Sequence, residues 1–315
     1  VLRVELARVE AMNDRVRKYE FRSVDGIPLP PFEAGAHIDV VVAPEYFRQY
    51  SLCGNPADTS VYQICVLRES LGRGGSRLLH QIFSEGRKVF VSRPINHFPL
   101  IESASKTLLL GGGIGITPLL AMAHRLHTIG AEFALHYCCK SRDTAGFLAD
   151  LASVPWAHRV SLHVSAEDSR ANLDTILSGY QDGHHCYTCG PDRYMTAVIN
   201  TAQKQGWPAA ALHHEYFSVP HTPDYENHEF VLKLARSGRE VPVTAHQSAA
   251  QALLTAGIPV ILKCSDGLCG VCKCELLAGE VEHRDHVLSM AQREHAIILC
   301  QSRAARAGGE IVINL

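Results

Sequence analysis

Over the first hundred residues, apolar and polar side chains alternate in short runs that turn residues separate. A period of two is typical of a strand with one buried face. Only one helix is expected in this region, around 76–83. Strands are expected at 2–6, 18–22, 37–42, 49–52, 61–67 and 88–91. Several short strands without intervening helices predict an antiparallel β-barrel over residues 1–102.

From residue 103 onward, strand-like runs alternate with helical ones. Strands are expected at 106–110, 133–138, 159–164 and 185–189, and helices at 119–126 and 192–205. Thr117 is predicted to cap the first of these helices, with Pro118 as its first residue. This alternation predicts an α/β domain with a parallel sheet over residues 103–220.

A polar stretch without periodicity, residues 221–229, is typical of a linker. Alternation then returns at 230–234 and 240–243, and Ser248 can cap a short helix. Residues 230–315 are therefore predicted to form a third module of mixed α+β structure.

Composition narrows the function classes. The 315 residues include 30 Lys+Arg and 32 Asp+Glu, which excludes a generally basic nucleic-acid binder. The 46% hydrophobic content excludes a disordered acidic chain. No apolar run approaches the ~18 residues of a membrane span, and the alternating start does not resemble a secretory signal. Eleven cysteines without an export signal favour metal or redox use in a reducing cytoplasm over disulfides.

Three cysteines near the end of the chain have the spacing C-x4-C-x2-C, and a fourth follows after a long gap. This is the plant-type ferredoxin arrangement for a [2Fe-2S] cluster. Gly267 and Gly270 would let the loop curl and direct backbone N–H groups toward the sulfurs. The predicted ligands are Cys264, Cys269, Cys272 and Cys300.

A structural zinc site is the alternative, although zinc sites more often use paired C-x2-C units. Cys274 is predicted to be a buried small hydrophobic residue, because four ligands already fill the site. His283 and His286 suggest a Rieske centre, which needs two histidine ligands, but the four cysteines leave no position for them.

The segment 111–118, Gly-Gly-Gly-Ile-Gly-Ile-Thr-Pro, follows a predicted strand and precedes a helix. Glycines at such a turn let the backbone approach a pyrophosphate, and the helix N-terminus supplies donors. Pro118 replaces the third glycine of G-x-G-x-x-G, so a plain packing turn is the alternative. Residues 189–191, Cys-Gly-Pro, end a later strand, where ligands bind in open α/β sheets.

Two barrel segments also carry candidate chemistry: Arg48 to Leu52, and the glycine-rich loop from Gly72 to Ser76. The loop could cradle a phosphate through its backbone N–H groups and the following helix N-terminus. A simple loop is the alternative.

Together the motifs resemble the phthalate dioxygenase reductase and vanillate O-demethylase reductase family, over essentially all 315 residues. The matching segments, in family order, are 31–37, 48–53, 72–76, 111–118, 189–191 and 264–272. The resemblance implies a flavin-binding barrel, a NAD-binding domain and a β-grasp-like ferredoxin domain. It implies an oxidoreductase that passes electrons from NADH through FMN to a [2Fe-2S] cluster. Plant-type clusters have reduction potentials of about −400 mV. The partner would be a separate Rieske-type oxygenase of the aromatic acid dioxygenase or O-demethylase class.

The resemblance also assigns residues. Flavin contacts fall on Arg48, Gln49, Tyr50, Ser51, Cys65, Val66, Leu67, Gly72, Gly74, Gly75 and Ser76. Nicotinamide nucleotide contacts fall on Gly113, Gly115, Thr117, Cys189, Gly190 and Pro191, and closure of the flavin site on Glu215 and Phe217. No catalytic acid or base is expected, since the cofactors carry the chemistry.

Several alternatives stay open. The glycine-rich loop resembles the FMN subgroup rather than FAD proteins. The resemblance favours NADH, yet Lys140, Ser141 and Arg142 at the end of the second strand could accept a 2′-phosphate. The same modules could serve a cytochrome P450 or another acceptor, or form a redox carrier or sensor with a vestigial nucleotide site. No nucleic-acid or membrane partner is expected.

Overall fold

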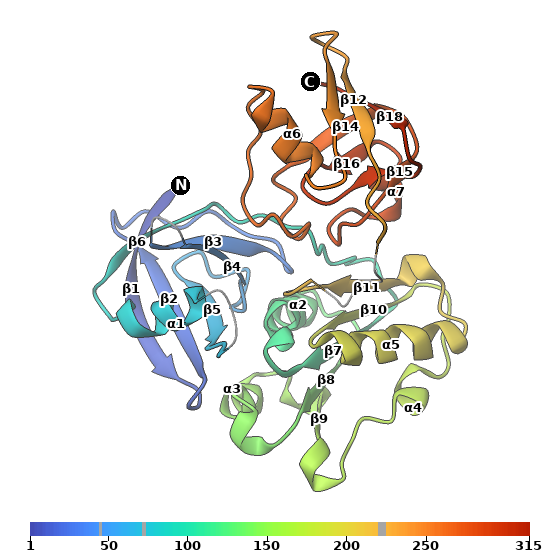
Figure 1. The fold of residues 1–315 in the computed structure, drawn as a ribbon. Coiled ribbons are helices and arrows are strands. Elements are labelled where there is room, and N and C mark those ends of the chain that lie inside the picture. The colour runs from blue at the N-terminus through green and yellow to red at the C-terminus, as the bar shows by residue number, and fades with distance from the viewer. Residues whose placement is uncertain (44–45, 71–73, 220–224) are drawn as a thin grey trace. The chain divides into compact units, whose positions relative to one another are not determined.

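In a computed structural model of the chain, the described residues are 1–43, 46–70, 74–219 and 225–315. They divide into two compact units, Val1–Glu215 and Tyr216–Leu315 (Figure 1). Each unit is described on its own. The predicted linker at 221–229 lies partly outside the described residues.

The N-terminal part of the first unit is a six-stranded antiparallel sheet in the order β4-β3-β6-β1-β2-β5. An antiparallel bridge between Leu52 and Ile64 joins the two edges, so the sheet curls into a barrel. The strands are β1 (Leu2–Ala11), β2 (Val16–Ser23), β3 (His37–Ala43), β4 (Tyr46–Ser51), β5 (Tyr62–Leu67) and β6 (Lys88–Val91), and helix α1 spans Gly75–Ile82. The period-two pattern forms this barrel because alternate side chains fill its interior.

The rest of the first unit is a parallel sheet in the order β11-β10-β7-β8-β9. The strands are β7 (Lys106–Gly112), β8 (Phe133–Cys139), β9 (Val160–Val164), β10 (His184–Cys189) and β11 (Leu212–Glu215). The α-helices are α2 (Ile116–Thr128), α3 (Leu148–Ser153), α4 (Leu173–Leu177) and α5 (Asp192–Lys204). Short 3-10 helices lie at Gly113–Gly115, Arg142–Thr144, Ala157–Arg159, Ser165–Glu167 and Ala209–Ala211. The chain runs one way from β7 to β9 and the other way to β10 and β11, so a topological switch point lies beside β7.

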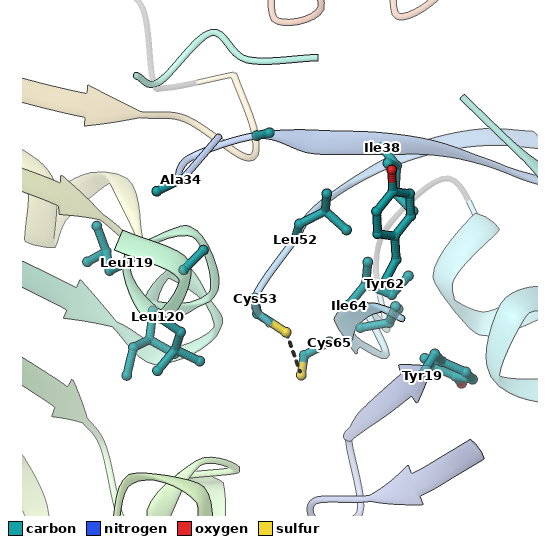
Figure 2. Packing of buried hydrophobic residues seen from close by; sticks show 14 of the residues in the cluster. Tyr19, Ala34, Ile38, Leu52, Cys53, Tyr62, Ile64, Cys65, Leu119 and Leu120 are labelled. Carbon is teal, nitrogen blue, oxygen red and sulfur yellow. Dashed lines mark hydrogen bonds between the residues drawn. The ribbon is translucent and has the colours of Figure 1, made fainter. Parts of the chain in front are cut away.

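One hydrophobic cluster spans the barrel and α2, which explains why both belong to a single unit. Figure 2 shows Leu119 and Leu120 of α2 in the same cluster as Leu52 and Ile64 of the barrel. Helix α2 is apolar on most of its surface because it is enclosed: nine of its residues are buried.

The second unit contains a mixed five-stranded sheet in the order β13-β12-β18-β14-β16. Its elements are β12 (Phe230–Leu234), β13 (Glu240–Val243), α6 (Ala249–Thr255), β14 (Lys273–Ala278), β15 (Val281–Glu282), α7 (Met290–Arg293), β16 (Ala296–Ile298), β17 (Arg303–Ala304) and β18 (Gly309–Ile313). Strand β12 is antiparallel to β13 and parallel to β18. The Ser248 side chain caps α6, as predicted, by accepting a hydrogen bond from the Gln251 N–H at 3.2 Å.

One local prediction was wrong. Helix α2 begins at Ile116, so Thr117 lies inside its first turn and is not the N-cap. The 3-10 turn at Gly113–Gly115 runs directly into the helix, and the Thr117 hydroxyl donates to the Ile114 carbonyl at 3.0 Å. Pro118 is consequently the third helical residue, where it is still tolerated.

Within the described ranges, no helix combines the length and apolar character needed to cross a membrane.

Candidate functional site

A cavity of about 670 Å³ opens at the carboxyl ends of β7 and β8, beside the switch point of the parallel sheet. Its floor includes Gly112, Gly113 and Pro191, and one wall is the barrel hairpin Asn13–Val16. Open α/β sheets bind nucleotides at this edge. We call it the nucleotide cavity.

The two predicted pyrophosphate glycines differ in their surroundings. Gly113 lines the nucleotide cavity, has φ +55° and has open space where a Cβ would stand. A Cβ at Gly115 would lie 2.4 Å from the Cys189 carbonyl carbon and oxygen and 2.5 Å from the Gly190 nitrogen. Gly113 therefore leaves room for a ligand, whereas Gly115 lets the start of α2 pack against the end of β10.

Cys189 ends β10 between two neighbouring strands, paired with Gly111 of β7 and Glu215 of β11. The residue is fully buried, and this burial, together with the charge of Glu215, raises the pKa of its thiol. Cys189 is therefore a neutral apolar packing group beside the predicted nicotinamide position.

On the barrel side, the structure brings Arg48 of β4 against the start of α1. A Cβ at Gly75 would lie 2.5 Å from Arg48 Nε, so only glycine allows this contact. Gly74, with φ +86°, precedes α1, and the Ser76 hydroxyl accepts a hydrogen bond from the Glu69 N–H at 3.1 Å. Gly72 lies outside the described residues. A guanidinium at a helix N-terminus is a suitable cradle for a phosphate.

The next two residues of β4 have different surroundings. Gln49 Nε2 lies 2.8 Å from His37 Nε2 on the adjacent strand. The buried Tyr50 hydroxyl has no hydrogen-bond partner among the described residues, and burial raises the pKa of Tyr50. A buried hydroxyl without a partner is costly, so Tyr50 suits a site that a polar cofactor completes.

The three predicted flavin residues of β5 form the wall behind this site. Cys65 and Val66 are buried, and Leu67 lines the nucleotide cavity. Figure 2 shows Cys65 facing Cys53, with the two sulfurs 3.7 Å apart. Their side chains supply packing surface, since burial raises the pKa of the Cys65 thiol well above its usual range.

The barrel and the parallel sheet meet at a pair of polar side chains. The Ser51 hydroxyl, at the end of β4, donates to Glu215 Oε2 at 3.4 Å, at the end of β11. Burial of the carboxyl group raises the pKa of Glu215 to about 8. The carboxyl group is therefore mostly protonated at neutral pH and can donate as well as accept a hydrogen bond at this junction.

This shift predicts a pH dependence of stability. The carboxyl ionises near 4.5 when unfolded and near 8 when folded, so the folded state retains a proton that the unfolded state loses. Stability attributable to Glu215 is greatest below pH 4.5 and falls as the pH rises to 8. Relative to Glu215→Gln, the native protein should lose about 2–4 kcal/mol of unfolding free energy between pH 5 and 8. Urea unfolding of the first unit at several pH values measures this difference, and parallel pH profiles would contradict it.

Phe217, predicted to close the flavin site with Glu215, falls in the second unit and is 45% exposed. Glu215 lies at the end of the first unit, beside the barrel, whereas Phe217 belongs to the second unit. Its flavin role stays a prediction.

In the second unit, the four predicted cluster cysteines lie together. The Cys264 thiol hydrogen-bonds to Cys269 and Cys300, which lowers its pKa, and Cys272 also hydrogen-bonds to Cys300. Gln301 Nε2 donates to the Ser265 carbonyl at 2.7 Å, which ties the distant Cys300 segment to the loop. Residues 264–272 are called the cluster loop below.

The cluster loop turns back on itself through three left-handed residues, Ser265, Gly267 and Gly270. The Asp266 N–H donates to Cys264 Sγ at 3.4 Å, as expected for a loop that directs N–H groups to its sulfurs. Backbone groups of Asp266 and Leu268 add to the lowering of the Cys264 pKa, whereas the contacts with the other cysteine thiols raise the pKa values of Cys269 and Cys300. Donors aimed at the sulfurs favour thiolates, which are the form that binds iron.

Among the described residues, no group of three or more His, Cys, Asp or Glu side chains is arranged to hold a single metal ion. A [2Fe-2S] cluster shares four cysteines between two irons, so two thiolates per iron suffice. Cys274, predicted to be a buried small hydrophobic residue, is partly buried on β14 and packs against the hydrophobic core of the second unit. The His286 N–H donates to the Gly267 carbonyl at 3.1 Å, which supports the loop.

Sequence reasoning missed the residues that come from distant segments. The hairpin Asn13–Val16 lines the nucleotide cavity although about a hundred residues separate it from Gly113. Asp143 also lines this cavity, and Arg142 pairs with Glu167. No local pattern signals such contacts, because they depend on how the two sheets pack.

Comparisons with known proteins agree with this architecture. Residues 232–305 match the 2Fe-2S iron-sulfur cluster binding domain. The chain is 41% identical to the reductase subunit of tert-butanol monooxygenase / tert-amyl alcohol desaturase of Aquincola tertiaricarbonis, covering 97% of this chain and 96% of that protein. It is 37% identical to vanillate O-demethylase oxidoreductase of a Pseudomonas strain, covering 98% of each. It is also 37% identical to phthalate dioxygenase reductase of Burkholderia cepacia, covering 100% of this chain and 97% of that protein.

Solved structures give the same result. A structure of phthalate dioxygenase reductase has a TM-score of 0.72 at 36% identity and covers 100% of this chain and 98% of its own. An intact type IV self-sufficient cytochrome P450 monooxygenase has a TM-score of 0.91 at 35% identity. This chain spans only 41% of that P450 protein.

These similarities confirm the predicted fold class, the oxidoreductase class and the cofactor set of FMN, NADH and a [2Fe-2S] cluster. Full-length identity above a third to several reductase components leaves no part of the chain unaccounted for. The chain therefore belongs to the phthalate dioxygenase reductase and vanillate O-demethylase reductase family.

Proposed function

We propose that this protein passes electrons from NADH through FMN to its [2Fe-2S] cluster and on to a separate Rieske-type oxygenase of the aromatic acid dioxygenase or O-demethylase class. The Ser51–Glu215 contact carries this proposal, because it joins the predicted flavin strand to the end of the nucleotide sheet. The names of the phthalate and vanillate relatives support the class of partner. Stopped-flow mixing with NADH tests it: flavin and cluster absorbance should both bleach, whereas a colourless protein that binds zinc would overturn it.

The flavin-binding residues would be Arg48, Tyr50, Ser51 and the segment 74–76. Arg48 and the N-terminus of α1 would neutralise the phosphate, and the Tyr50 hydroxyl would gain its missing partner. When bound, FMN takes up two electrons together and releases them singly. The hydrogen bond between Ser51 and the mostly protonated Glu215 would hold the barrel and the parallel sheet together at the junction.

The nucleotide would lie in the nucleotide cavity, with its pyrophosphate near Gly113 and Pro191. Buried Cys189 and Thr117 would shape the nicotinamide position and keep water from it. These residues would act by orientation, which can contribute as much as chemical catalysis when the cofactors carry the reaction.

The Arg142–Glu167 pair supports NADH over NADPH. The guanidinium is engaged by both carboxylate oxygens of Glu167, at 2.9, 3.1 and 3.2 Å. The Ser141 hydroxyl lies 3.2 Å from that of Thr144. Two of the three groups that could take a 2′-phosphate are therefore occupied, and the charge of Glu167 would repel one.

Replacing Glu167 with glutamine should make NADPH a better substrate. It removes a negative charge and frees the Arg142 fork, so kcat/KM for NADPH relative to NADH should rise about tenfold. Steady-state kinetics with both nucleotides measure the ratio. Glu132→Gln is the control, since Glu132 pairs with Lys106 at the opposite end of β8. An unchanged ratio would count against this explanation.

A cytochrome P450 is the second candidate acceptor, and the similarity to the self-sufficient P450 monooxygenase favours it. The two acceptors can be separated directly. With NADH present, the reductase should support product formation by a purified Rieske-type oxygenase and give little reduction of a P450; the reverse result would favour the second candidate.

We propose that the protein works in the reducing cytoplasm. In the structure none of the eleven cysteines forms a disulfide, and the cluster loop needs reduced thiols to assemble.

A further inference from the structure

A second cavity, of about 500 Å³, lies on the barrel; it shares Arg15 with the nucleotide cavity, and its other lining residues carry no predicted function. Its walls come from the start of β2 and the residue before it, from the chain just after β5 and from α1. The lining residues are Arg15, Arg17, Arg68, Ser70, Arg77, His80 and Gln81. Four of the seven are arginines and none is acidic, in a chain whose net charge is −2. We call it the arginine cavity.

The four arginines lack carboxylate partners within the described part of the chain. Other arginines of this unit are paired: Arg125 Nε lies 2.7 Å from Glu102, and Arg142 Nε lies 2.9 Å from Glu167. Guanidinium groups stay charged at any physiological pH, so the arginine cavity concentrates four uncompensated positive charges. A bound anion would relieve their mutual repulsion.

Hydrogen bonds hold Arg17 and His80 in place in the cavity wall. Arg17 Nη1 donates to the His80 carbonyl at 2.6 Å, and His80 Nε2 lies 2.9 Å from the Val66 carbonyl. Since a carbonyl oxygen only accepts, His80 Nε2 carries the proton. Burial, helped by the nearby charges of Arg17 and Arg68 and opposed by the hydrogen bond to Val66, lowers the pKa of His80 and so disfavours its charged form. The positive charge therefore resides on the guanidinium groups.

The chemistry of the lining identifies the ligand. The planar guanidinium fork fits pairs of phosphate oxygens, which lysine does not match. The volume lies in the range of small-molecule sites, about 300–1,000 Å³. Four positive charges suit two linked phosphoryl groups better than one. We propose that the arginine cavity binds a small molecule bearing a diphosphate group.

This site is separate from the one proposed for the FMN phosphate. Gly74, Gly75 and Ser76 at the start of α1 do not line the arginine cavity, whereas Arg77, His80 and Gln81, further along the helix, do. The diphosphate ligand should therefore bind while FMN is in place. The proposal does not depend on electron transfer to any oxygenase.

Calorimetric titration of the FMN-loaded protein with inorganic pyrophosphate tests the site. The Kd for pyrophosphate should lie below about 1 mM. In the Arg68→Ala/Arg77→Ala variant, Kd should be higher by about tenfold or more. Both side chains are exposed, so the fold should tolerate their removal. Arg3→Ala/Arg22→Ala removes two exposed barrel charges outside the cavity and should leave Kd unchanged.

Three results would overturn the proposal. The first is no binding by the FMN-loaded protein. The second is equal loss of affinity in both double variants, which would indicate a general charge effect. The third is evidence that the cavity holds the flavin phosphate. Binding of pyrophosphate only after FMN is removed would give this evidence, and so would loss of flavin absorbance from Arg68→Ala/Arg77→Ala.

Discussion

Replacing Cys269 with serine should abolish the [2Fe-2S] cluster while sparing the first unit. Cys269 is 4% exposed and hydrogen-bonds to Cys264, so its thiol lies within the group of four. A serine hydroxyl is not a thiolate at neutral pH and cannot hold iron in its place. NADH-driven reduction of cytochrome c or of the oxygenase should fall more than about 100-fold. Reduction of ferricyanide, which takes electrons directly from flavin, should persist because Arg48, Tyr50 and Ser51 lie in the other unit.

Cys274→Ser is the matched control for this experiment. Cys274 stands two residues after Cys272, on β14, and pairs with Ile297 of β16. Its substitution should leave iron content, the visible spectrum and the EPR signal of the reduced protein unchanged. Loss of iron from Cys274→Ser but not from Cys269→Ser would show that the ligand assignment is wrong.

Replacing Gly115 with alanine should disrupt the nucleotide domain more than any other single methyl group added to the glycine-rich turn. The new Cβ would lie 2.4 Å from backbone atoms of Cys189, and backbone cannot move aside as a side chain can. Overpacking of this kind costs about 3 kcal/mol of unfolding free energy. If α2 shifts away from β10, kcat/KM for NADH should also fall about 100-fold, because a shift near 1 Å misplaces the bound nucleotide.

Gly113→Ala separates steric overlap from backbone strain. Gly113 has φ +55°, but no atom lies within 4 Å of the place where the new methyl group would stand, so only the left-handed backbone opposes alanine. That strain costs about 1–2 kcal/mol. Thermal or urea unfolding should therefore rank Gly115→Ala as the less stable variant. The opposite ranking would mean that the contact between α2 and β10 is not the constraint on Gly115.

The parts of the site that sequence predicted are those contained in short segments. C-x4-C-x2-C brings three thiols together within nine residues, and Gly267 and Gly270 do take left-handed conformations there. The same spacing also predicted the distant fourth ligand Cys300, whose segment Gln301 ties to the loop. The Thr117 cap failed for a local reason as well: a 3-10 turn precedes the helix, and the pattern of residue types does not distinguish it from a capped start.

The sequence did not show which charged side chains are free to bind a ligand. Sequence suggested that Arg142 could take a 2′-phosphate, but Glu167, 25 residues later, already occupies it. Conversely, Arg15, Arg17, Arg68 and Arg77 gave no signal along the chain, yet they surround one cavity. A charge pattern in one dimension does not reveal which charges are paired.

By itself the sequence determined the strand and helix periodicities, the order of the modules, the iron-binding motif and, through six ordered motifs, the family. These properties depend on backbone propensity, side-chain period and ligand spacing, all of which act over a few residues. Only the tertiary structure decided that Ser51 meets Glu215, that Gly115 must pack on Cys189, and that four arginines share a cavity. Such contacts join residues far apart in sequence, and their energies depend on burial and distance, which exist only once the sheets have packed.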